Sequence, residues 1–450
     1  MDSMTIHEAA SICGGTVLGR MVSEYITGKI VIDSREVRNG DLFAAYKGER
    51  ADGHNYIGSA FEHGAACCLA EHIPEGEERC VIQVESVQAS VEKLAAAYRR
   101  RFDIPVVGIT GSVGKTTAKE MISAVLGQHF RLIKTEGNLN NQIGVPMMLS
   151  RFKEEHEAAV IEMGISNFGE MSCLAEMVRP TVAVFTVIGH AHLEFLHDLD
   201  GVLRAKTEML EYMQDTSPVV LNGDDPMLAA LQCRQRKILY GFSEQCDVRP
   251  ENICVTEKET KCDIVCGFRR IQVSIPAFGR HHVSAALAAA AVGMPLGLSD
   301  DEISIGIAAF KNVGRRSELI HTGFLTLIDD TYNANPDSVR SGIDSLVQLS
   351  GVRHICMLGD MLELGENSSR MHYEIGEYAS EHGIDLVLTS GRLAKEISSA
   401  MGQKGIHFET REELISSLPN LLQKDDCVLV KASKGSHFET VSAAIRQMSH

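Results

Sequence analysis

The chain has 450 residues, of which 44% are hydrophobic and 23% are charged, and its formal net charge is −17. At roughly 150 residues per domain this length predicts about three domains, and the composition is that of a globular protein with buried cores. The negative charge argues against binding to nucleic acid or to a membrane surface, because both partners are anionic.

The N-terminal residues 1–8 lack the basic and apolar regions of a signal peptide, and no apolar run in the sequence is long enough to span a bilayer. The 12 cysteines are scattered and include no Cys-x-x-Cys pair. Without a secretion signal this usage is typical of reduced, buried thiols. We therefore expect a cytoplasmic protein that does not insert into membranes.

The first part of the chain mixes short strands with helices. Residues 41–46 form a predicted strand that closes on the turn Lys47-Gly48-Glu49, and residues 89–101 form a predicted helix. Pro105 ends the helical pattern. We therefore expect an N-terminal domain over residues 1–101, a central domain over 102–313 and a C-terminal domain over 314–450.

The most informative segment is residues 108–117, Gly-Ile-Thr-Gly-Ser-Val-Gly-Lys-Thr-Thr, which follows an apolar run. A strand that leads through a glycine-rich turn into a helix points several backbone N–H groups at one spot, where the helix N-terminus adds partial positive charge. Lys115 supplies an ammonium group for the outer phosphates, and Thr116 a hydroxyl suited to Mg²⁺. The glycine spacing departs from the strict P-loop, and the plain alternative is an ordinary strand-to-helix turn. The Gly-Lys-Thr-Thr ending favours a nucleoside triphosphate site.

Beyond the P-loop, apolar strand-like runs alternate with helical ones. The expected strands are 106–109, 158–162, 182–188, 219–221 and 238–240. Strands rich in Val and Ile with intervening helices predict a mostly parallel sheet covered on both faces. The stretch 252–275 predicts β-hairpins, and an alanine-rich helix at 284–292 closes this part.

A third α/β part begins after Gly314. Its expected strands are 324–328, 354–358, 385–389 and 428–430. Asn335 is suited to cap a helix whose first turn holds Pro336. The predicted fold class is therefore α/β throughout.

Polar residues follow two strands of the predicted central sheet. Glu162 ends one strand and can hold Mg²⁺ against the phosphates, because ligands bind at the carboxyl ends of parallel strands. The strand 182–188 leads into His190 and His192. Isolated histidines are usually structural, but two strands that converge on one P-loop make Glu162 and His192 a candidate pair. Lys206 lies in a helical stretch, where its spacing alone indicates a surface lysine.

Several segments together resemble the Mur ligase family over nearly the whole chain. They are Thr110–Thr117, Glu136–Pro146, Glu162–Gly164, Gly189–Glu194, Leu221–Asp225, Asp329–Pro336 and Leu358–Glu366. In the N-terminal part, Asp33–Arg35 and Gly48–His54 are similar to the region that receives the UDP-sugar in this family. The irregular P-loop spacing matches the family's form. The last two of the seven segments best match the members that add D-alanyl-D-alanine.

The resemblance implies an ATP-dependent amide ligase that uses Mg²⁺ and acts in peptidoglycan precursor synthesis. The terminal carboxylate of UDP-N-acetylmuramoyl-tripeptide would attack the γ-phosphate of ATP, and the amine of D-alanyl-D-alanine would then attack the acyl phosphate. The implied domains are an N-terminal α/β domain that binds the UDP-sugar, a central P-loop ATPase-type domain, and a C-terminal Rossmann-like domain that closes on the nucleotide. We expect a monomer.

The same resemblance assigns roles to individual residues. The implied catalytic residues are Lys115, Glu162, His192, Lys206 and Arg316, with Arg315 as the alternative to Arg316. The implied metal ligands are Thr116, Glu162, His192 and Lys206, the last at a position where related ligases carry a lysine carbamylated by CO₂. The implied nucleotide-binding residues are Gly111, Ser112, Val113, Gly114, Lys115, Thr116, Thr117, Asn138, His282 and Asp330, with Asp330 at the ribose. The implied substrate-binding residues are Ser34, Arg35, Gly53 and His54, together with Asn333 and Asn335 for the dipeptide.

Two departures from the family pattern leave the acceptor open. His282 and Ala285 replace two asparagines of the adenine-side helix, and Lys431-Ala432-Ser433-Lys434 replaces Lys-Gly-Ser-Arg. Lys434 keeps the charge of arginine but not its two-pronged hydrogen bonding. The alternatives are a Mur-type ligase with a different amino acid or dipeptide acceptor, and a nucleotide-binding paralogue without catalysis. A folylpolyglutamate-synthetase-like enzyme fits less well around Asp329–Pro336.

Overall fold

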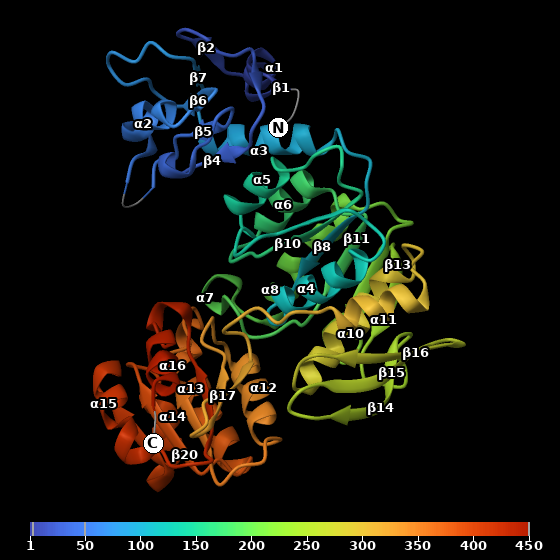
Figure 1. Cartoon of the computed structure of the whole chain (residues 1–450), viewed down its shortest axis with the longest axis vertical. Coiled ribbons are helices and arrows are strands. Elements are labelled where there is room, and N and C mark those ends of the chain that lie inside the picture. Colours follow the sequence, from blue (N-terminus) through green and yellow to red (C-terminus); the bar gives the residue numbers. More distant parts are fainter. Residues whose placement is uncertain (2–3, 49–50, 449–450) are drawn as a thin grey trace.

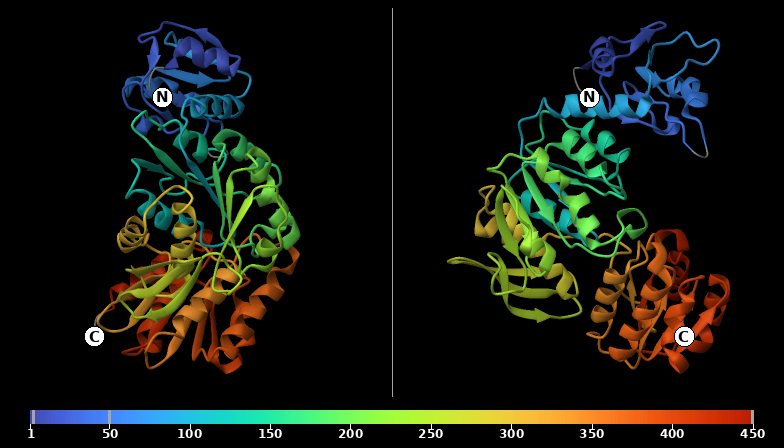
Figure 2. Two further views of the ribbon diagram at one scale, coloured as in Figure 1. Left: turned by 90° about the vertical axis from the view of Figure 1, so that its right-hand side faces the viewer. Right: turned by 180° about the vertical axis from the view of Figure 1, so that it is seen from behind.

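The computed structural model describes residues 1, 4–48 and 51–448. Its elements form three units that follow one another along the molecule (Figure 1). The N-terminal unit comprises β1 to α3, the middle unit β8 to α11 and the C-terminal unit β17 to α16. The middle unit lies between the other two, as all three views show (Figures 1 and 2).

The N-terminal unit is built on a five-stranded sheet of order β2-β7-β6-β5-β4, parallel except for the β2–β7 pair. Its strands are β2 Thr16–Leu18, β4 Ile30–Val31, β5 Leu42–Ala44, β6 Cys67–Ala70 and β7 Val81–Gln83, beside the small pair β1 Met4–Thr5 and β3 Tyr25–Ile26. Its helices are α1 Ile6–Cys13, α2 Ile57–Glu62 and α3 Val87–Arg99. The predicted helix 89–101 starts two residues earlier, because the Ser86 hydroxyl caps it by accepting from the N–H of Ala89.

Helix α3 joins the N-terminal unit to the middle unit. The Tyr98 hydroxyl donates to the carbonyl of Phe152 at 2.8 Å, and Arg99 Nε donates to the carbonyl of Val178 at 2.9 Å. Buried apolar side chains of both units form one continuous core around this helix. The two units are therefore joined through apolar packing as well as through the chain.

The middle unit contains a six-stranded parallel sheet of order β13-β12-β11-β8-β10-β9. Its strands are β8 Val106–Thr110, β9 Leu132–Lys134, β10 Ala158–Glu162, β11 Val182–Phe185, β12 Pro218–Asn222 and β13 Arg236–Tyr240. Its helices are α4 Lys115–Leu126, α5 Gly144–Leu149, α6 Glu170–Val178, α7 Leu193–Leu196, α8 Leu199–Thr207, α9 Pro226–Ala230, α10 Arg280–Gly293 and α11 Asp300–Ala308. Alternate strand residues pack toward α4, α10 and α11 on one face and toward α5, α6 and α8 on the other. The predicted parallel sheet covered on both faces is confirmed.

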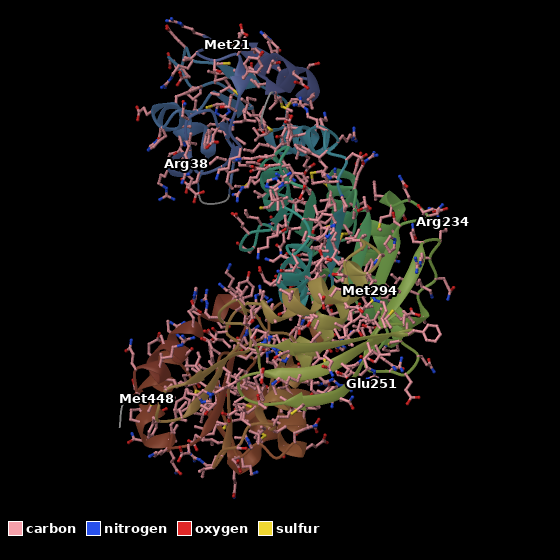
Figure 3. All side chains as sticks on the ribbon, turned by 45° about the vertical axis from the view of Figure 1, so that its right-hand side comes forward. Met21, Arg38, Arg234, Glu251, Met294 and Met448 are labelled. Carbon is pink, nitrogen blue, oxygen red and sulfur yellow. The ribbon has the colours of Figure 1, made fainter. Side chains whose placement is uncertain are left out.

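A small antiparallel sheet projects from the middle unit. Its strands β14 Arg249–Val255, β15 Thr260–Cys266 and β16 Arg269–Ile275 pair in sequence order, as the predicted β-hairpins require. The labelled Glu251 marks this sheet in Figure 3. The alanine-rich helix expected at 284–292 is α10, which begins at Arg280.

The C-terminal unit holds a second six-stranded sheet, of order β17-β18-β22-β19-β20-β21, in which only the edge strand β17 is antiparallel. Its strands are β17 Glu318–His321, β18 Thr326–Asp329, β19 His354–Leu358, β20 Leu386–Ser390, β21 Gly405–Phe408 and β22 Cys427–Lys431. Its helices are α12 Pro336–Leu346, α13 Ser368–Glu381, α14 Lys395–Ala400, α15 Arg411–Leu421 and α16 Glu439–Arg446. The predicted cap is confirmed, because Asn335 Oδ1 accepts from the N–H of Ser338 at 2.9 Å.

The structure departs from the predicted elements in two respects. The strand expected at 182–188 ends at Phe185, since the next residues leave the sheet to bond the P-loop. Short or mixed-sequence elements such as β9, β17, β21 and α11 did not stand out in the sequence. Among the described residues, no helix is both long enough and apolar enough to cross a membrane.

Candidate active site

The P-loop lies between β8 and α4 and is shaped by two glycines. Gly111 has φ +148°, and a Cβ atom there would lie 2.0 Å from the hydroxyl oxygen of Thr186. Gly114 has φ +83° and precedes the first residue of α4. Lys115 Nζ donates to the carbonyl of Gly111 at 2.7 Å. The loop therefore curls back over the start of its helix, where backbone N–H groups and the helix dipole favour an anion.

The neighbouring strand end fixes the rim of the P-loop. The N–H of Ser112 donates to the carbonyl of Val187 at 2.7 Å, and the Ser112 hydroxyl exchanges 2.9 Å hydrogen bonds with the backbone of Gly189. The Thr186 hydroxyl donates to the carbonyl of Val113 at 2.6 Å. Ser112 therefore supplies its N–H to the protein in this structure, while none of the described hydrogen bonds uses the N–H of Lys115 or Thr116.

Glu162 sits at the carboxyl end of β10, beside the P-loop. Its side chain is buried, and one carboxylate oxygen accepts from the Thr116 hydroxyl at 2.9 Å. The other oxygen accepts from the side-chain amide of Asn140 at 2.8 Å. The structure thus brings together two of the predicted metal ligands, Thr116 and Glu162. It also adds Asn140, which the sequence analysis did not single out although its segment was noted.

The two histidines after β11 contact the C-terminal unit, and His192 directly precedes α7, which lies beside that unit in Figure 1. His192 Nδ1 lies 2.5 Å from a carboxylate oxygen of Glu363, although the contact lacks hydrogen-bond geometry. This proximity lowers the pKa of Glu363. His190 pairs with Asp337, which accepts from its backbone N–H at 2.6 Å and contacts its ring. Both histidines therefore contact carboxylates from another unit, and the predicted role of His192 as a metal ligand stays a prediction.

Lys206 on α8 is buried, with 1% of its surface exposed, in contrast to the surface lysine that its sequence spacing indicates. Burial lowers the pKa of Lys206 well below its ordinary value, and the charge of nearby Lys115 lowers it further. No hydrogen bond or ion pair to its amine is found among the described residues. A buried amine with a lowered pKa and no acidic partner is a feature of functional sites more than of structural ones.

Arg316 approaches the P-loop from the C-terminal side. Burial and the nearby charge of Arg316 lower the pKa of Lys115, while the Glu162 carboxylate raises it. The Arg316 guanidinium lies over the ring of Tyr332. Arg315 instead lines a separate surface pocket with Asp329 and Arg446. The structure therefore favours Arg316 over Arg315 as the cation that faces the phosphate site.

Asp330 is engaged within its own unit. One carboxylate oxygen accepts from the N–H of Ser317 at 3.0 Å, and the other contacts Lys431 Nζ at 2.5 Å. Lys431 also donates to the carbonyl of Asn333, whose side chain is exposed, while Asn335 caps α12. A ribose that bound Asp330 would have to share this carboxylate with Lys431.

The remaining predicted nucleotide contacts are spread over the middle unit. His282 is buried, its Nδ1 bonds the carbonyl of Phe278 at 2.9 Å, and its Nε2 has no partner among the described residues. Burial lowers its pKa well below the usual value. Asn138 is exposed and Thr117 half-buried. No hydrogen bond found among the described residues joins these three to one another.

The predicted UDP-sugar residues lie in the N-terminal unit, apart from the P-loop. Arg35 is exposed and pairs with Asp33 at 2.6 Å, and Ser34 is buried beside it. The N–H of Gly53 donates to the carbonyl of Tyr46 at 2.8 Å. Glu49 and Arg50 of the quoted segment Gly48–His54 lie outside the described residues.

His54 belongs to a close group with Asp52 and His72, a combination that invites a metal-site interpretation. Its Nδ1 bonds Asp52 at 2.6 Å, and its Nε2 accepts from the N–H of Glu71 at 3.0 Å. Both ring nitrogens are therefore occupied by protein groups. The geometry favours a structural His54 over a metal ligand, and its part in UDP-sugar binding stays a prediction.

Family models match all three units. Residues 28–108 match the catalytic domain of the Mur ligase family, residues 109–293 the Mur ligase middle domain, and residues 315–434 the Mur ligase glutamate ligase domain. The three models together cover most of the chain in the order of its three units.

Similar proteins are known along the full length. The chain is 34% identical to UDP-N-acetylmuramoyl-tripeptide–D-alanyl-D-alanine ligase of Bacillus subtilis, with 98% of each chain covered. Among solved structures, MurF from Acinetobacter baumannii superposes with a TM-score of 0.92 at 30% identity over 99% of both chains. MurF ligase from Thermotoga maritima in complex with ADP gives a TM-score of 0.85 at 30% identity, covering 95% of this chain and 99% of its own.

Proposed function

The chain belongs to the Mur ligase family, and we propose that it is the ligase that joins UDP-N-acetylmuramoyl-tripeptide to D-alanyl-D-alanine at the expense of ATP. Its relatives of equal length are named for this reaction, and the similarity leaves no unit of the chain uncovered. The reaction belongs to peptidoglycan precursor synthesis.

The chemistry has two steps. A carboxylate oxygen of the tripeptide attacks the γ-phosphorus of ATP, ADP leaves, and an acyl phosphate forms. The amine of the dipeptide then attacks the acyl carbon, loses a proton and displaces phosphate, which completes the amide. Because the first step brings two anions together, positive charge fixed in the right place is the main requirement.

The observation that carries the proposal is the approach of two cations at the P-loop. Lys115 lies on α4, and Arg316 approaches it from the C-terminal unit. The charge of Arg316 lies near enough to lower the pKa of Lys115. Two like charges are brought together in this way where an anion is to be bound. We propose that Lys115 and Arg316 hold the transferring phosphate between them.

The residues present fit a magnesium ion. The Thr116 hydroxyl and the Glu162 carboxylate offer adjacent oxygen donors of the kind Mg²⁺ prefers, and Asn140 orients the carboxylate. When bound, the ion would supply charge neutralisation at the phosphate oxygens. His192 and Lys206 are proposed as further ligands. His192 would then exchange its contact with Glu363 for the ion.

Lys206 fits the proposal that it carries a carbamate. A neutral amine can attack CO₂, form an N–C bond and release a proton, whereas an ammonium cannot. Burial and the charge of Lys115 both favour the neutral amine at Lys206. The carbamate would carry a negative charge toward Lys115. This modification would therefore place an anion where its attraction to Lys115 favours it.

The three units are proposed to divide the substrates as follows. The N-terminal domain, residues 1–101, binds the UDP-sugar, the central domain, residues 102–313, binds ATP, and the C-terminal domain, residues 314–450, closes on the nucleotide and binds the dipeptide. Ser34, Arg35, Gly53 and His54 serve the first role, and Asn333 and Asn335 the last. The enzyme is proposed to act in the cytoplasm as a monomer.

The test is an acceptor-dependent assay with the full chain. Phosphate release is measured with ATP, Mg²⁺ and UDP-N-acetylmuramoyl-tripeptide, with D-alanyl-D-alanine or single amino acids added in turn. The product is identified by mass spectrometry. Both a diaminopimelate and a lysine tripeptide are supplied, and Lys115→Ala serves as the inactive control.

Phosphate release that depends on D-alanyl-D-alanine and yields the pentapeptide product supports the proposal. Phosphate release that depends on a different amino acid or dipeptide would identify a Mur-type ligase with another acceptor. If no acceptor elicits phosphate release while ATP still binds, the chain is a nucleotide-binding paralogue without catalysis.

A further inference from the structure

The guanidinium of Arg316 is held against an aromatic ring. Its central carbon lies 3.7 Å from the centroid of the Tyr332 ring, a stacking distance. A guanidinium stacked on a ring keeps its N–H groups in its own plane, so that they stay available for a second partner. Lys434 Nζ lies 5.9 Å from the same ring. Tyr332 therefore gathers two cations without using their hydrogen-bond donors.

The backbone around Arg316 is held in an unusual conformation. Arg315 has φ +63° and Ser317 φ +49°, so that both neighbours adopt the left-handed region that side chains disfavour. Such a conformation persists only where surrounding contacts determine it, and it is concentrated at functional sites. The backbone is therefore fixed on both sides of Arg316, which limits the directions that its side chain can take.

Four hydrogen bonds hold this turn, and one of them runs within it, from the N–H of Arg315 to the Glu318 carboxylate at 3.3 Å. The N–H of Tyr332 donates to the carbonyl of Arg315 at 3.2 Å, and the side-chain amide of Asn312 donates to the carbonyl of Arg316 at 3.0 Å. The N–H of Ser317 donates to Asp330, which Lys431 holds from the other side. Tyr332 therefore contacts the turn twice, through its backbone and through its ring.

The segment that carries Tyr332 reaches the rim of the P-loop across the boundary between two units. Asp337, five residues after Tyr332, accepts from the N–H of His190 at 2.6 Å, and the preceding Gly189 bonds Ser112 of the P-loop. Arg316 lies within electrostatic reach of Lys115, the lysine of the P-loop itself. Tyr332 is half-buried and touches neither Lys115 nor Glu162 among the described contacts. Among the described contacts, the ring of Tyr332 is linked to the predicted catalytic residues through Arg316.

We propose that Tyr332 is a positioning residue for phosphoryl transfer, whose ring holds the Arg316 guanidinium so that its free N–H edge meets the γ-phosphate beside Lys115. The inference rests on the proposed function, since it assigns Arg316 a phosphate to contact. It predicts that the ring face of Tyr332 matters and that the hydroxyl does not. A guanidinium without its ring would lose rotational order before each turnover.

The test is a set of four variants measured for kcat and for the KM of ATP. Tyr332→Phe keeps the ring and should retain nearly the full kcat. Tyr332→Leu removes it and should lower kcat by about ten- to a hundred-fold, the loss expected when a catalytic group is misplaced by about an ångström. Arg316→Ala should lower kcat at least as far. In Arg316→Ala, adding Tyr332→Leu should have little further effect, because the two residues act as one unit.

A matched control removes another ring from under an arginine. Phe61→Leu, in the N-terminal unit, takes away the ring over which Arg79 lies at 4.6 Å and should leave kcat unchanged. Thermal unfolding of each variant shows whether it is folded. If Tyr332→Leu fails to fold, the comparison of Tyr332→Phe with Tyr332→Trp replaces it, since both retain a ring and both should remain active.

Three results would overturn the inference. They are a Tyr332→Leu enzyme as active as the parent, a Tyr332→Phe enzyme as impaired as Tyr332→Leu, and losses from Tyr332→Leu and Arg316→Ala that multiply in the double variant. A failure of the proposed function looks different, because the unmodified chain would then release no phosphate with any acceptor. A failure of the inference leaves that chain active.

Discussion

The middle and C-terminal units each bury a lysine near the end of a parallel sheet, and the two lysines differ in their surroundings. Lys431, the last residue of β22, lies 2.5 Å from a carboxylate oxygen of Asp330 and donates to the carbonyl of Asn333. Lys206 on α8 is as deeply buried, but the charge that acts on it is the like charge of Lys115. Lys431 is paired with a carboxylate of its own unit, whereas Lys206 has no acidic partner among the described residues.

The difference teaches which of the two buried charges serves structure and which serves chemistry. A buried ion pair with satisfied hydrogen bonds can persist in a folded unit, whereas an unpaired buried ammonium loses its proton instead. The lowered pKa of Lys206 is the sign of that second outcome. Four predictions follow from the comparison, the first with the largest effect.

Replacing Lys206 should separate activity from stability. Lys206→Met removes the proposed carbamate, and we expect ligase turnover to fall by about a hundred-fold or more, as for other losses of fixed charge in an active site. The same change removes an uncompensated buried amine, so the thermal midpoint in CO₂-free, Mg²⁺-free buffer should rise by about 2–4 °C. Phosphate release and calorimetry provide the two measurements.

The lowered pKa of Lys206 also predicts how the stability of the fold changes with pH. The pKa of Lys206 is lower in the folded chain than in the unfolded one, so folding releases its proton. Stability should therefore rise with pH between the folded and the unfolded value and fall as the pH is lowered through that window. Lys206→Met should flatten this slope. Lys206→Arg, which cannot give up its proton, should be less stable than the parent, and a stable Lys206→Arg would contradict the comparison.

Replacing Lys431 should have the opposite effect on stability. Lys431→Met leaves the partly buried Asp330 carboxylate without its cation, and we expect a loss of about 3 kcal/mol in the free energy of unfolding, the lower end of the range for a broken buried pair. Urea unfolding followed by circular dichroism measures it. The double variant Lys431→Met/Asp330→Asn should regain part of the loss, since neither charge remains. An equally unstable double variant would mean that packing, and not charge, governs the site.

The sequence predicted the strands and the P-loop of the middle unit well, because each is specified by a pattern of neighbouring residues. The run ending in Glu162 and the Gly-Lys-Thr-Thr segment each carry a complete pattern within about ten residues, and both lie where predicted. Asn335 likewise has its partner, Ser338, three residues away. In each case the residues that determine the structure are neighbours in the chain.

The contacts between units could not be predicted in the same way. His190 meets Asp337, and Lys115 lies near Arg316, across large separations in sequence, and no local pattern encodes such pairings. Lys206 shows the same limit, since its spacing indicated a surface lysine and burial was decided by distant elements. The ring contact of Tyr332 with Arg316 joins residues 16 positions apart in the chain, and no local pattern marks such a contact.

Lys119 provides an intermediate case between the two lysines. It is buried on α4, donates to the carbonyl of Thr135 at 2.9 Å, and pairs with Glu120 at 2.9 Å. Glu120 keeps a second partner in Lys134. Glu162, whose carboxylate lies 4.0 Å from Lys119, keeps its hydrogen bonds from Thr116 and Asn140, so Lys119→Met leaves neither carboxylate without a partner. We expect a loss of about 2 kcal/mol in the free energy of unfolding, the value of hydrogen bonds from a charged donor. A loss as large as that of Lys431→Met would show that the second partner does not compensate.

The smallest effect on stability is expected at Glu302, an exposed carboxylate whose hydrogen-bond partners lie mostly in its own capping box. Glu302 accepts from the N–H of Ser299 at 2.8 Å in the capping box of α11 and contacts His129 at 2.8 Å, and these bonds lower its pKa to about 2. Its contribution to stability should be complete above the ordinary glutamate value and should disappear as the pH falls toward 2. NMR titration of the carboxyl carbon measures the pKa directly. Glu302→Gln keeps the acceptor oxygen that the cap requires and removes the charge, so its thermal midpoint at neutral pH should fall slightly, by the amount that the parent loses when this carboxylate is protonated. A loss as large as that of Lys431→Met would mean that an exposed charge counts as much as one in a buried ion pair, and the pairing of Lys431 would then no longer be special.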